Sequence, residues 1–259
     1  LENYNTLINP EVKEILEALS AEEVQEELTE NEKVIVKELK KTFRDLELIP
    51  PEEIQAYQIL LAKADPVWEE AKNTNNYELF APVLEEIISY NKKFAGYKQK
   101  EGQKLYDVLL DEYEEGFTME ILDDFFGKLR ASLVPIVHAV KEKSDFISID
   151  CLRKTYDIEV QKKLSRFMAE YIGFDFNRGV IAETAHPYTT NLHNHDVRIT
   201  NHYQENKLED AIFSIVHEGG HALYEMGISD ELTLTPIGGG TSMGMHESQS
   251  RFYENTTLQ

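Results

Sequence analysis

The feature that most restricts how this sequence can fold is an apolar stretch from Ala211 to Gly227, which has the pattern His-Glu-Xaa-Xaa-His at its centre. Apolar residues recur there at helical spacing on two neighbouring stripes, so we predict a buried helix. Positions four apart share one face of a helix, and His217 and His221 can therefore direct both imidazoles at one metal ion. Glu218 lies one step round the helix, where it can reach a water molecule beside the metal.

Two glycines inside this predicted helix break its local preference. Gly219 and Gly220 each lower helix propensity by about 1 kcal/mol relative to alanine. A rule broken inside a buried helix favours a functional reason, so we expect another backbone or a substrate to approach closely here. The alternative is a core helix with two hydrogen-bonded histidines and no metal.

The charge of the chain narrows its possible partners. The formal net charge is -22 over 259 residues, which repels nucleic acid and anionic membranes, and we expect neither as a partner. No apolar run approaches the roughly 20 residues that span a bilayer. No signal peptide is visible, and the single cysteine, Cys151, cannot form an internal disulfide. We therefore expect a cytoplasmic protein.

Residues 1–173 are predicted to form an all-helical scaffold. Asn9-Pro10 is typical of a helix start, with asparagine as the N-cap and proline in the first turn. Ser20 and Glu23 have the spacing of a capping box, which predicts that a new helix begins there. This scaffold carries no indication of function by itself.

Periodic apolar residues predict further helices over residues 77–94, 103–113, 119–140 and 149–172. Pro135 should kink or end the third of these helices, and Gly173 should end the fourth. We expect the fourth helix to carry one apolar face, made of Leu152, Tyr156, Val160, Leu164, Phe167 and Tyr171.

The composition changes after Gly173, and residues 174–259 are predicted to form a metal-binding region. Two short β-like runs, at residues 180–181 and 197–200, predict a small sheet beside the metal-binding helix. The expected fold is therefore mainly α, with a small β-sheet next to the helix that carries the histidine pair.

Alternate residues of the second β-like run should share one face of the sheet. Asp196, Arg198 and Thr200 would then present an acid, a cation and a hydroxyl together, with Val197 and Ile199 packed on the opposite face. The alternative is an exposed strand on which Asp196 and Arg198 form an ion pair.

Two further histidines, His193 and His195, would share a strand face and could form a second metal site. The alternative is that both are solvated loop residues.

Two histidines do not complete a catalytic zinc site, which needs a third protein ligand and an open position for water. Glu225 lies on the histidine face, but about 12 Å of helix rise separates it from His217. A second predicted helix follows the glycines at 238–240, and its Glu247 could enter the site with Arg251 one turn further on to hold its carboxylate. His246 is the competing ligand, because it points about 100° away and only one of the two can fit.

Four ordered motifs stand together between residues 180 and 255: His186-Pro187, Asp196-Val-Arg198-Ile-Thr200, His217-Glu-Gly-Gly-His221 and His246-Glu-Ser-Gln249. In this order the sequence resembles the Taq-type (thermostable) zinc carboxypeptidase family. The resemblance implies a neurolysin-like helical metallopeptidase fold and the removal of C-terminal residues from peptides, commonly by a homodimer.

The same resemblance implies the roles of individual residues. His217, His221 and Glu247 would bind Zn²⁺, with another divalent metal such as Co²⁺ as a possible substitute, and Glu218 would act as general base and acid. Contact with the substrate or support of the ligands is expected from His186, Asp196, Arg198, Thr200, His246 and Arg251.

The sequence also departs from the family pattern. Tyr188 stands where the family usually has phenylalanine, and Asn201-His202 replaces Thr-Arg, which removes one cation. Two later family motifs are missing, one of them thought to supply the arginine that grips the substrate carboxylate. We therefore expect the N-terminal part of a longer enzyme. The alternatives are a zinc oligopeptidase or endopeptidase of similar fold, and a non-catalytic helical fragment.

Overall fold

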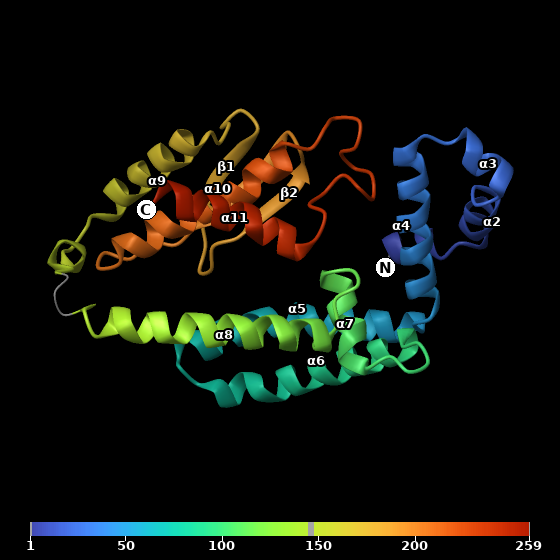
Figure 1. Ribbon diagram of the computed structural model, residues 1–259, viewed down its shortest axis with the longest axis horizontal. Helices are drawn as coiled ribbons and strands as arrows, with labels where there is room; N and C mark the ends of the chain where they lie inside the picture. The colour runs from blue at the N-terminus through green and yellow to red at the C-terminus, as the bar shows by residue number, and fades with distance from the viewer. Residues whose placement is uncertain (1, 145–147, 259) are drawn as a thin grey trace. The chain divides into compact units, whose positions relative to one another are not determined.

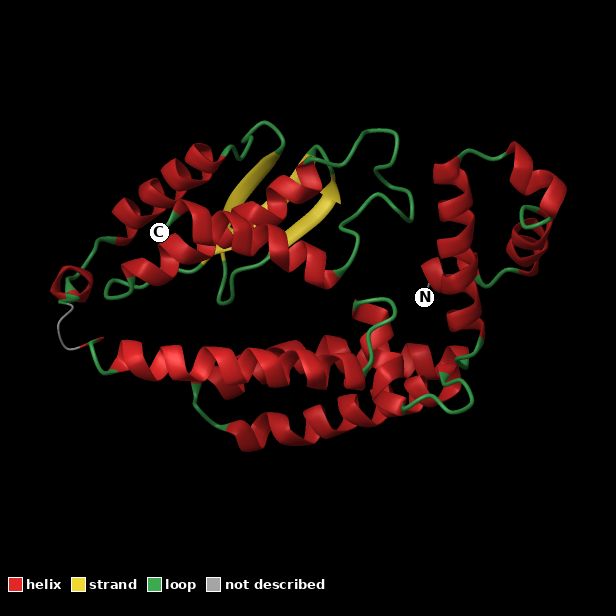
Figure 2. Cartoon of the chain, in the orientation of Figure 1, coloured by secondary structure: helices red, strands yellow, loops and turns green. Residues whose placement is uncertain are grey.

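The computed structural model describes residues 2–144 and 148–258. The chain is mainly helical with one small three-stranded sheet, as expected (Figure 2). It divides into two compact units, Leu1–Met119 and Glu120–Gln259. The boundary predicted at Gly173 concerns a different point, the start of the metal-binding region, and it stays a prediction. Among the described helices, none is long and apolar enough to cross a membrane.

The regular elements among the described residues of the first unit are all helices, whose bounds are α1 (Glu2–Leu7), α2 (Pro10–Ala18), α3 (Glu22–Glu27), α4 (Glu30–Glu47), α5 (Pro51–Asn73), α6 (Tyr77–Lys98) and α7 (Leu105–Tyr113). Asn9 caps α2 as predicted, because its side chain accepts the N–H of Glu11. The predicted capping box at Ser20 is wrong: the Ser20 hydroxyl instead donates to the carbonyl of Leu16 at 2.6 Å, at the end of α2.

The capping box occurs one helix later, at the start of α4. The Thr29 side chain accepts the N–H of Glu32, and the Glu32 carboxylate accepts the N–H of Thr29 at 2.8 Å. This reciprocal pair satisfies two backbone donors that the first turn of a helix leaves without partners.

Helix α8 (Met119–Lys141) continues through Pro135, so the proline does not end it. Most of its large apolar side chains are exposed, including those of Phe125, Phe126, Leu129, Leu133, Ile136 and Val140.

The helix predicted over residues 149–172 is two elements. A short 3-10 helix spans Asp150–Arg153, and α9 (Ile158–Ile172) starts where Asp157 accepts the N–H of Val160. Gly173 ends α9 with φ +100°, a left-handed conformation that glycine adopts without strain.

The buried face of α9 is not the predicted apolar one. Gln161, Ser165 and Ala169 are buried, whereas Val160 and Phe167 are exposed. The amide of the buried Gln161 donates to two backbone carbonyls, that of Tyr156 at 3.0 Å and that of Gln204, far along the chain, at 2.9 Å. Small and hydrogen-bonded residues therefore mark the contact, and hydrophobic periodicity does not detect them.

The sheet has the strand order β1-β3-β2, with β1 (Gly179–Glu183), β2 (Thr189–His193) and β3 (Asp196–Asn201). The central strand β3 pairs parallel with β1 and antiparallel with β2. Its Val197 and Ile199 are fully buried, as the alternation predicts. The strand β2 was not predicted.

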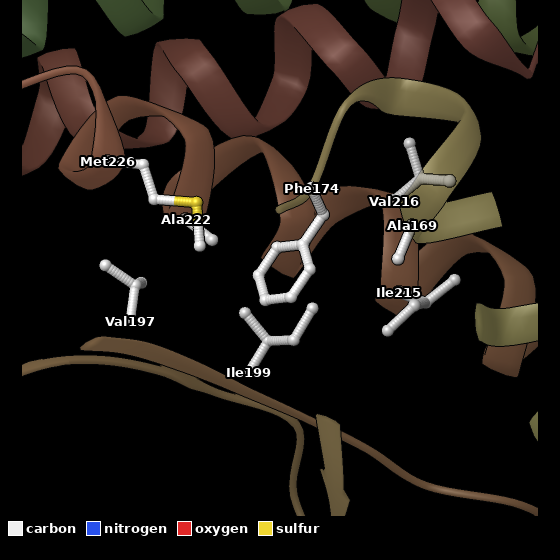
Figure 3. Packing of buried hydrophobic residues seen from close by; sticks show 8 residues of the cluster. All are labelled: Ala169, Phe174, Val197, Ile199, Ile215, Val216, Ala222 and Met226. Carbon is white, nitrogen blue, oxygen red and sulfur yellow. The ribbon is translucent and has the colours of Figure 1, made fainter. Parts of the chain in front are cut away.

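Helices α10 (Leu208–Met226) and α11 (Met243–Thr257) complete the second unit. The helix α10 is the central element, because it packs against α9, α11, β2 and β3 (Figure 1). Side chains from α9, α10 and β3 form the core together with Phe174, and Figure 3 shows Ala169, Phe174, Val197, Ile199, Ile215, Val216, Ala222 and Met226.

Neighbouring residues approach both glycines of α10 closely, and at Gly220 the neighbour is another backbone, as the sequence predicts. A Cβ atom on Gly220 would lie 2.7 Å from Cα of Ser250 in α11, and a Cβ on Gly219 would lie 2.3 Å from Cδ1 of Ile172 in α9. The contact at Gly220 is with backbone, which cannot move aside as a side chain can. Gly220 therefore sets how near α11 lies to the histidines.

Candidate metal centre

The side chains of His217 and His221 on α10 meet that of Glu247 on α11. Nε2 of His217 and Nε2 of His221 each lie 3.5 Å from Oε2 of Glu247. Their potential ligand atoms all lie within 4.8 Å of one another, so the three residues form a group that could hold a metal ion. No second group of this kind occurs in the part of the chain that the structure describes.

Two of the three donor groups, those of His221 and Glu247, have the charge state that a divalent metal needs. Burial, followed by the nearby His246 and His217, lowers the pKa of His221 to about 4, which leaves this ring neutral at pH 7. Burial acts to raise the pKa of Glu247, but the hydrogen bond from Arg251 and the charge of His217 hold it below its usual value. An imidazole pair with one ionised carboxylate is a donor set that suits zinc.

Two residues further along α11, Arg251 and Glu254, support Glu247 and His217 through polar contacts. Arg251 donates from Nε to Oε1 of Glu247 at 2.8 Å and from Nη1 to both oxygens of Glu254 at 3.0 Å. Glu254 in turn lies 2.9 Å from Nδ1 of His217. Sequence reasoning missed Glu254, although it follows Glu247 by seven residues, two turns along the same helix face.

Glu218 is buried beside the group and is hydrogen-bonded by β2. The hydroxyl of Thr189 donates to Oε2 of Glu218 at 2.7 Å. Burial raises the pKa of Glu218, and the Thr189 hydrogen bond and the charges of His217 and His186 only partly oppose it. A carboxylate whose pKa is raised towards neutrality is suited to accept and release a proton.

The strand β2 places a second polar side chain on α10. Thr189 and Asn191 are two residues apart and therefore lie on the same face of the strand. The Asn191 amide donates to the carboxylate of Glu225. Sequence reasoning missed this strand because Thr189 to His193 contains a single apolar residue and so shows no hydrophobic alternation. The repeated β-branched threonines were its one local signal.

His246 and Glu225 lie behind His221, outside the group of three. Nδ1 of His246 is 2.6 Å from Nδ1 of His221, and Nε2 of His246 is 2.6 Å from Oε1 of Glu225. The two residues that sequence reasoning weighed as alternative third ligands are therefore bonded to one another.

The polar residues of β3 do not form one cluster. Arg198 donates two hydrogen bonds of 2.8 Å to Asp196, and both side chains are about half exposed. Thr200 is buried, and its hydroxyl oxygen accepts the N–H of Tyr188 at 2.8 Å. Thr200 thus fastens the connection between β1 and β2.

The remaining candidate histidines lie at the end of β2 or in the connections between the strands. The backbone carbonyl of His186 accepts a hydrogen bond of 2.8 Å from the Thr184 hydroxyl, which is a contact of the main chain and not of the imidazole. Nε2 of His195 lies 2.7 Å from Asp230, and the N–H of His195 donates to Nδ1 of His193 at 3.1 Å. His193 and His195 are therefore engaged in a turn at the end of β2.

The chain is similar to known proteins over nearly its whole length. A family model described as carboxypeptidase Taq (M32) metallopeptidase matches residues 2–258. Carboxypeptidase 1 of Bacillus subtilis (strain 168) is 38% identical over 252 residues, which cover 97% of this chain and 50% of that protein. Thermostable carboxypeptidase 1 of Pyrococcus furiosus is 36% identical over 255 residues, which cover 98% of this chain and 50% of that protein.

Solved structures show the same relation. The crystal structure of the M32 carboxypeptidase from Deinococcus radiodurans R1 has a TM-score of 0.84 at 32% identity and matches 97% of this chain with 50% of its own. The Pyrococcus furiosus carboxypeptidase structure has a TM-score of 0.84 at 36% identity with the same coverage, 97% and 50%. The chain thus spans about half the length of the relatives it matches.

Proposed function

We infer the function of this chain from its family: it belongs to the carboxypeptidase Taq (M32) metallopeptidases. On that premise we propose that it holds a catalytic zinc ion and takes part in removing C-terminal residues from peptides. The observation that carries the proposal is the convergence of two imidazole nitrogens and one carboxylate oxygen within 4.8 Å, beside a buried glutamate.

The proposed ligands are His217, His221 and Glu247. When bound there, a zinc ion supplies Lewis acidity, which acidifies water and polarises a carbonyl group. Glu254 orients His217 through the contact of 2.9 Å at Nδ1, and Arg251 keeps Glu247 ionised and directed at the histidines.

Glu218 is the proposed general base and acid. It would take a proton from the attacking water and deliver it to the nitrogen of the leaving residue, as general acid–base catalysis requires. Its burial supports this role, because a raised pKa lowers the free energy needed at neutral pH to convert the carboxylate into the carboxylic acid. Thr189 keeps one oxygen of Glu218 in place.

The substrate's C-terminal carboxylate needs a binding site on the protein. His186, Asp196, Arg198 and Thr200 remain proposed substrate contacts or supporting residues. Asp196 already binds Arg198 through two hydrogen bonds, so a carboxylate would have to compete for this cation. Since the chain spans half the length of its relatives, we expect weaker turnover from it than from a protein of their full length.

The decisive experiment compares two forms of one peptide, with a free and with an amidated C-terminus, on the longest product of the gene. A carboxypeptidase removes residues from the free form only, whereas the alternative, a zinc oligopeptidase or endopeptidase, cleaves both. Loss of activity in Glu218→Gln with zinc content unchanged would support the assigned base, with Glu231→Gln as the control. Full activity in Glu218→Gln would overturn it.

Three further proposals accompany the function. We propose Zn²⁺ as the resident metal, to be checked by elemental analysis of purified protein against Co²⁺ and other divalent ions. A neurolysin-like arrangement of the complete fold and a homodimeric assembly are proposed from the family resemblance, and light scattering of the longest gene product tests the second of these.

A further inference from the structure

The family resemblance names His246 only as a substrate contact or a support of the ligands, without saying which, and gives Glu225 no role. Together with His221 they form a continuous line of contacts, 2.6 Å from His221 to His246 and 2.6 Å from His246 to Glu225. We propose that His246 and Glu225 are positioning residues, which hold His221 in the orientation and tautomer that metal binding needs. The inference rests on the proposed metal site and does not require that the chain hydrolyse peptides.

We call the contacts from His221 through His246 to Glu225 the relay. The direction of each of its hydrogen bonds follows from Nε2 of His221, the atom that faces the proposed metal position. Nε2 of His221 faces Oε2 of Glu247 at 3.5 Å and must keep its lone pair for the metal. A neutral imidazole then carries its proton on Nδ1, so His221 donates to Nδ1 of His246. Because that atom accepts, His246 carries its own proton on Nε2 and donates it to Glu225. This assignment satisfies all three side chains with two neutral rings and one carboxylate.

Glu225 is equipped to stay ionised at the end of the relay. It is 5% exposed, and a buried charge persists only where hydrogen bonds compensate it. Its Oε1 accepts the N–H of Gly240 at 3.1 Å, and its Oε2 accepts the Asn191 amide. Burial acts to raise the pKa of Glu225, but the hydrogen bonds from His246 and Gly240 together hold it below its usual value.

The ring of His246 is held from two further sides. A Cβ atom on Gly240 would lie 2.2 Å from Cδ2 of His246, so only glycine lets the loop backbone pass this close. The ring of Tyr224 meets the imidazole edge to face at 5.2 Å, and the Tyr224 hydroxyl is fixed by the N–H of Thr241 at 3.3 Å. These contacts limit the rotation of His246, and through it that of His221.

The two metal-facing histidines are thus supported in different ways. His217 contacts a carboxylate directly, at 2.9 Å from Glu254, whereas His221 reaches its carboxylate through a second imidazole. An outer partner of a metal-binding histidine fixes the ring and raises its basicity, and removing such a partner typically costs about 10- to 100-fold in metal affinity. His246 and Glu225 should therefore matter for metal affinity although neither touches the metal.

The test measures Zn²⁺ affinity by competition with a chromophoric chelator, and the visible absorption spectrum of the Co²⁺ form. We expect His246→Ala to weaken Zn²⁺ binding by about 10- to 100-fold and to change the Co²⁺ spectrum. Glu225→Gln keeps the shape of the side chain but removes its charge, and should weaken binding in the same direction. His202→Ala, which removes a histidine bonded to the Thr184 carbonyl instead, is the matched control.

Two comparisons separate positioning from general structural damage. His246→Asn keeps an acceptor near the position of Nδ1 but cannot reach Glu225, so it should recover part of the affinity that His246→Ala loses. The second comparison combines His246→Ala with Glu225→Gln in a double variant. It should bind Zn²⁺ about as weakly as His246→Ala alone, because both changes break the same chain of contacts.

Some outcomes would overturn the relay. These are additive losses in the double variant, an affinity within twofold of the wild type in both single variants, or failure of the wild type to bind Zn²⁺. If the wild type bound Zn²⁺ but hydrolysed no peptide, and the variants bound Zn²⁺ more weakly, the result would count against the proposed function and support the relay.

Discussion

The hydroxyl of Thr189 donates a hydrogen bond of 2.7 Å to Oε2 of Glu218, and thereby joins the edge strand β2 to the proposed catalytic base on α10. Glu218 is 8% exposed, so this hydrogen bond compensates part of the solvation that the carboxylate loses on burial. This bond leaves Oε1 as the oxygen available to a water molecule. It also partly opposes the rise in the pKa of Glu218 that burial causes.

Replacing Thr189 by valine keeps the shape of the side chain and removes this bond. We expect kcat of the longest gene product to fall about tenfold or more, a part of the 10²- to 10⁴-fold that a positioned base contributes. The pKa of Glu218 should rise further, so the acid limb of the kcat/KM profile should move to higher pH. Thr190→Val, the next residue of the strand, is the control, and an unchanged pH profile in Thr189→Val would refute the prediction.

Gly220→Ala tests whether the contact between α10 and α11 sets the metal geometry. The added Cβ would lie 2.7 Å from Cα of Ser250 and 2.9 Å from the carbonyl oxygen of Gln249. We expect a loss of about 1–3 kcal/mol in the free energy of unfolding, the usual cost of overpacking. Zn²⁺ affinity should fall too, because α11 carries Glu247.

The control for that variant is Gly239→Ala, since a Cβ on Gly239 would meet no atom within 4 Å. Urea unfolding of the metal-free proteins and Zn²⁺ titration give the two readouts. If Gly220→Ala matched Gly239→Ala in both, the close approach of the helices would not control the site.

Much of the candidate metal centre could be predicted from the sequence because helix geometry determines it. A spacing of four residues places His217 and His221 on one face, and a second helix starting after a glycine loop offers few carboxylates. As its distance along α10 predicts, Glu225 lies outside the group of His217, His221 and Glu247, and it contacts His246 instead. The family assignment is confirmed by the match over residues 2–258.

The parts that could not be predicted depend on contacts between distant polar residues. The strand β2 has almost no apolar residues, so its place in the sheet depends on pairing with β3 and on hydrogen bonds to α10. In α9 the buried contact is made by Ser165 and Ala169, and the Ser165 hydroxyl accepts the amide of Asn201 at 3.0 Å. Hydrophobic periodicity cannot locate contacts of this kind, which are satisfied by specific partners far along the chain.

Helix α8 exposes several large apolar side chains, among them Phe125 and Phe126, which are each 55% exposed. Contiguous exposed apolar surface favours association between molecules. We therefore expect this chain to self-associate as its concentration rises, and Phe125→Lys with Phe126→Lys to reduce the effect. Sedimentation velocity at several concentrations measures it, with Phe213→Lys, a change at an exposed phenylalanine on α10, for comparison. Equal self-association in all three proteins would contradict the prediction.

Asp230 links stability to pH at the turn after β2. Its Oδ1 accepts the Asn194 amide and lies near Nε2 of His195, at 2.7 Å each, and these bonds hold the pKa of Asp230 below its usual value. A carboxylate with a depressed pKa stabilises the fold above the unfolded-state pKa of about 3.9, and this contribution is lost as pH falls through the folded-state value.

Asp230→Asn should therefore lower Tm near pH 6, and the difference from the wild type should shrink as pH falls below about 3.9, where both side chains become neutral. Thermal melts monitored by circular dichroism across this range provide the measurement. Asp123→Asn, on the exposed surface of α8, is the control. A difference in Tm that does not change with pH would show that Asp230 stabilises the turn by packing and not by its charge.

Metal binding should stabilise the second unit because the proposed ligands come from two helices. His217 and His221 belong to α10 and Glu247 to α11, so an ion held by all three joins the helices and binds the folded state more tightly than the unfolded chain. At 100 times its Kd, such a ligand adds about 2.7 kcal/mol to the free energy of unfolding. We expect Tm to rise on titration with Zn²⁺ and to fall back when a chelator removes the ion. Glu247→Gln should abolish the rise, whereas Glu231→Gln, on the loop after α10, should keep it. A rise in Tm that persists in Glu247→Gln would mean that the stabilising ion binds elsewhere on the chain.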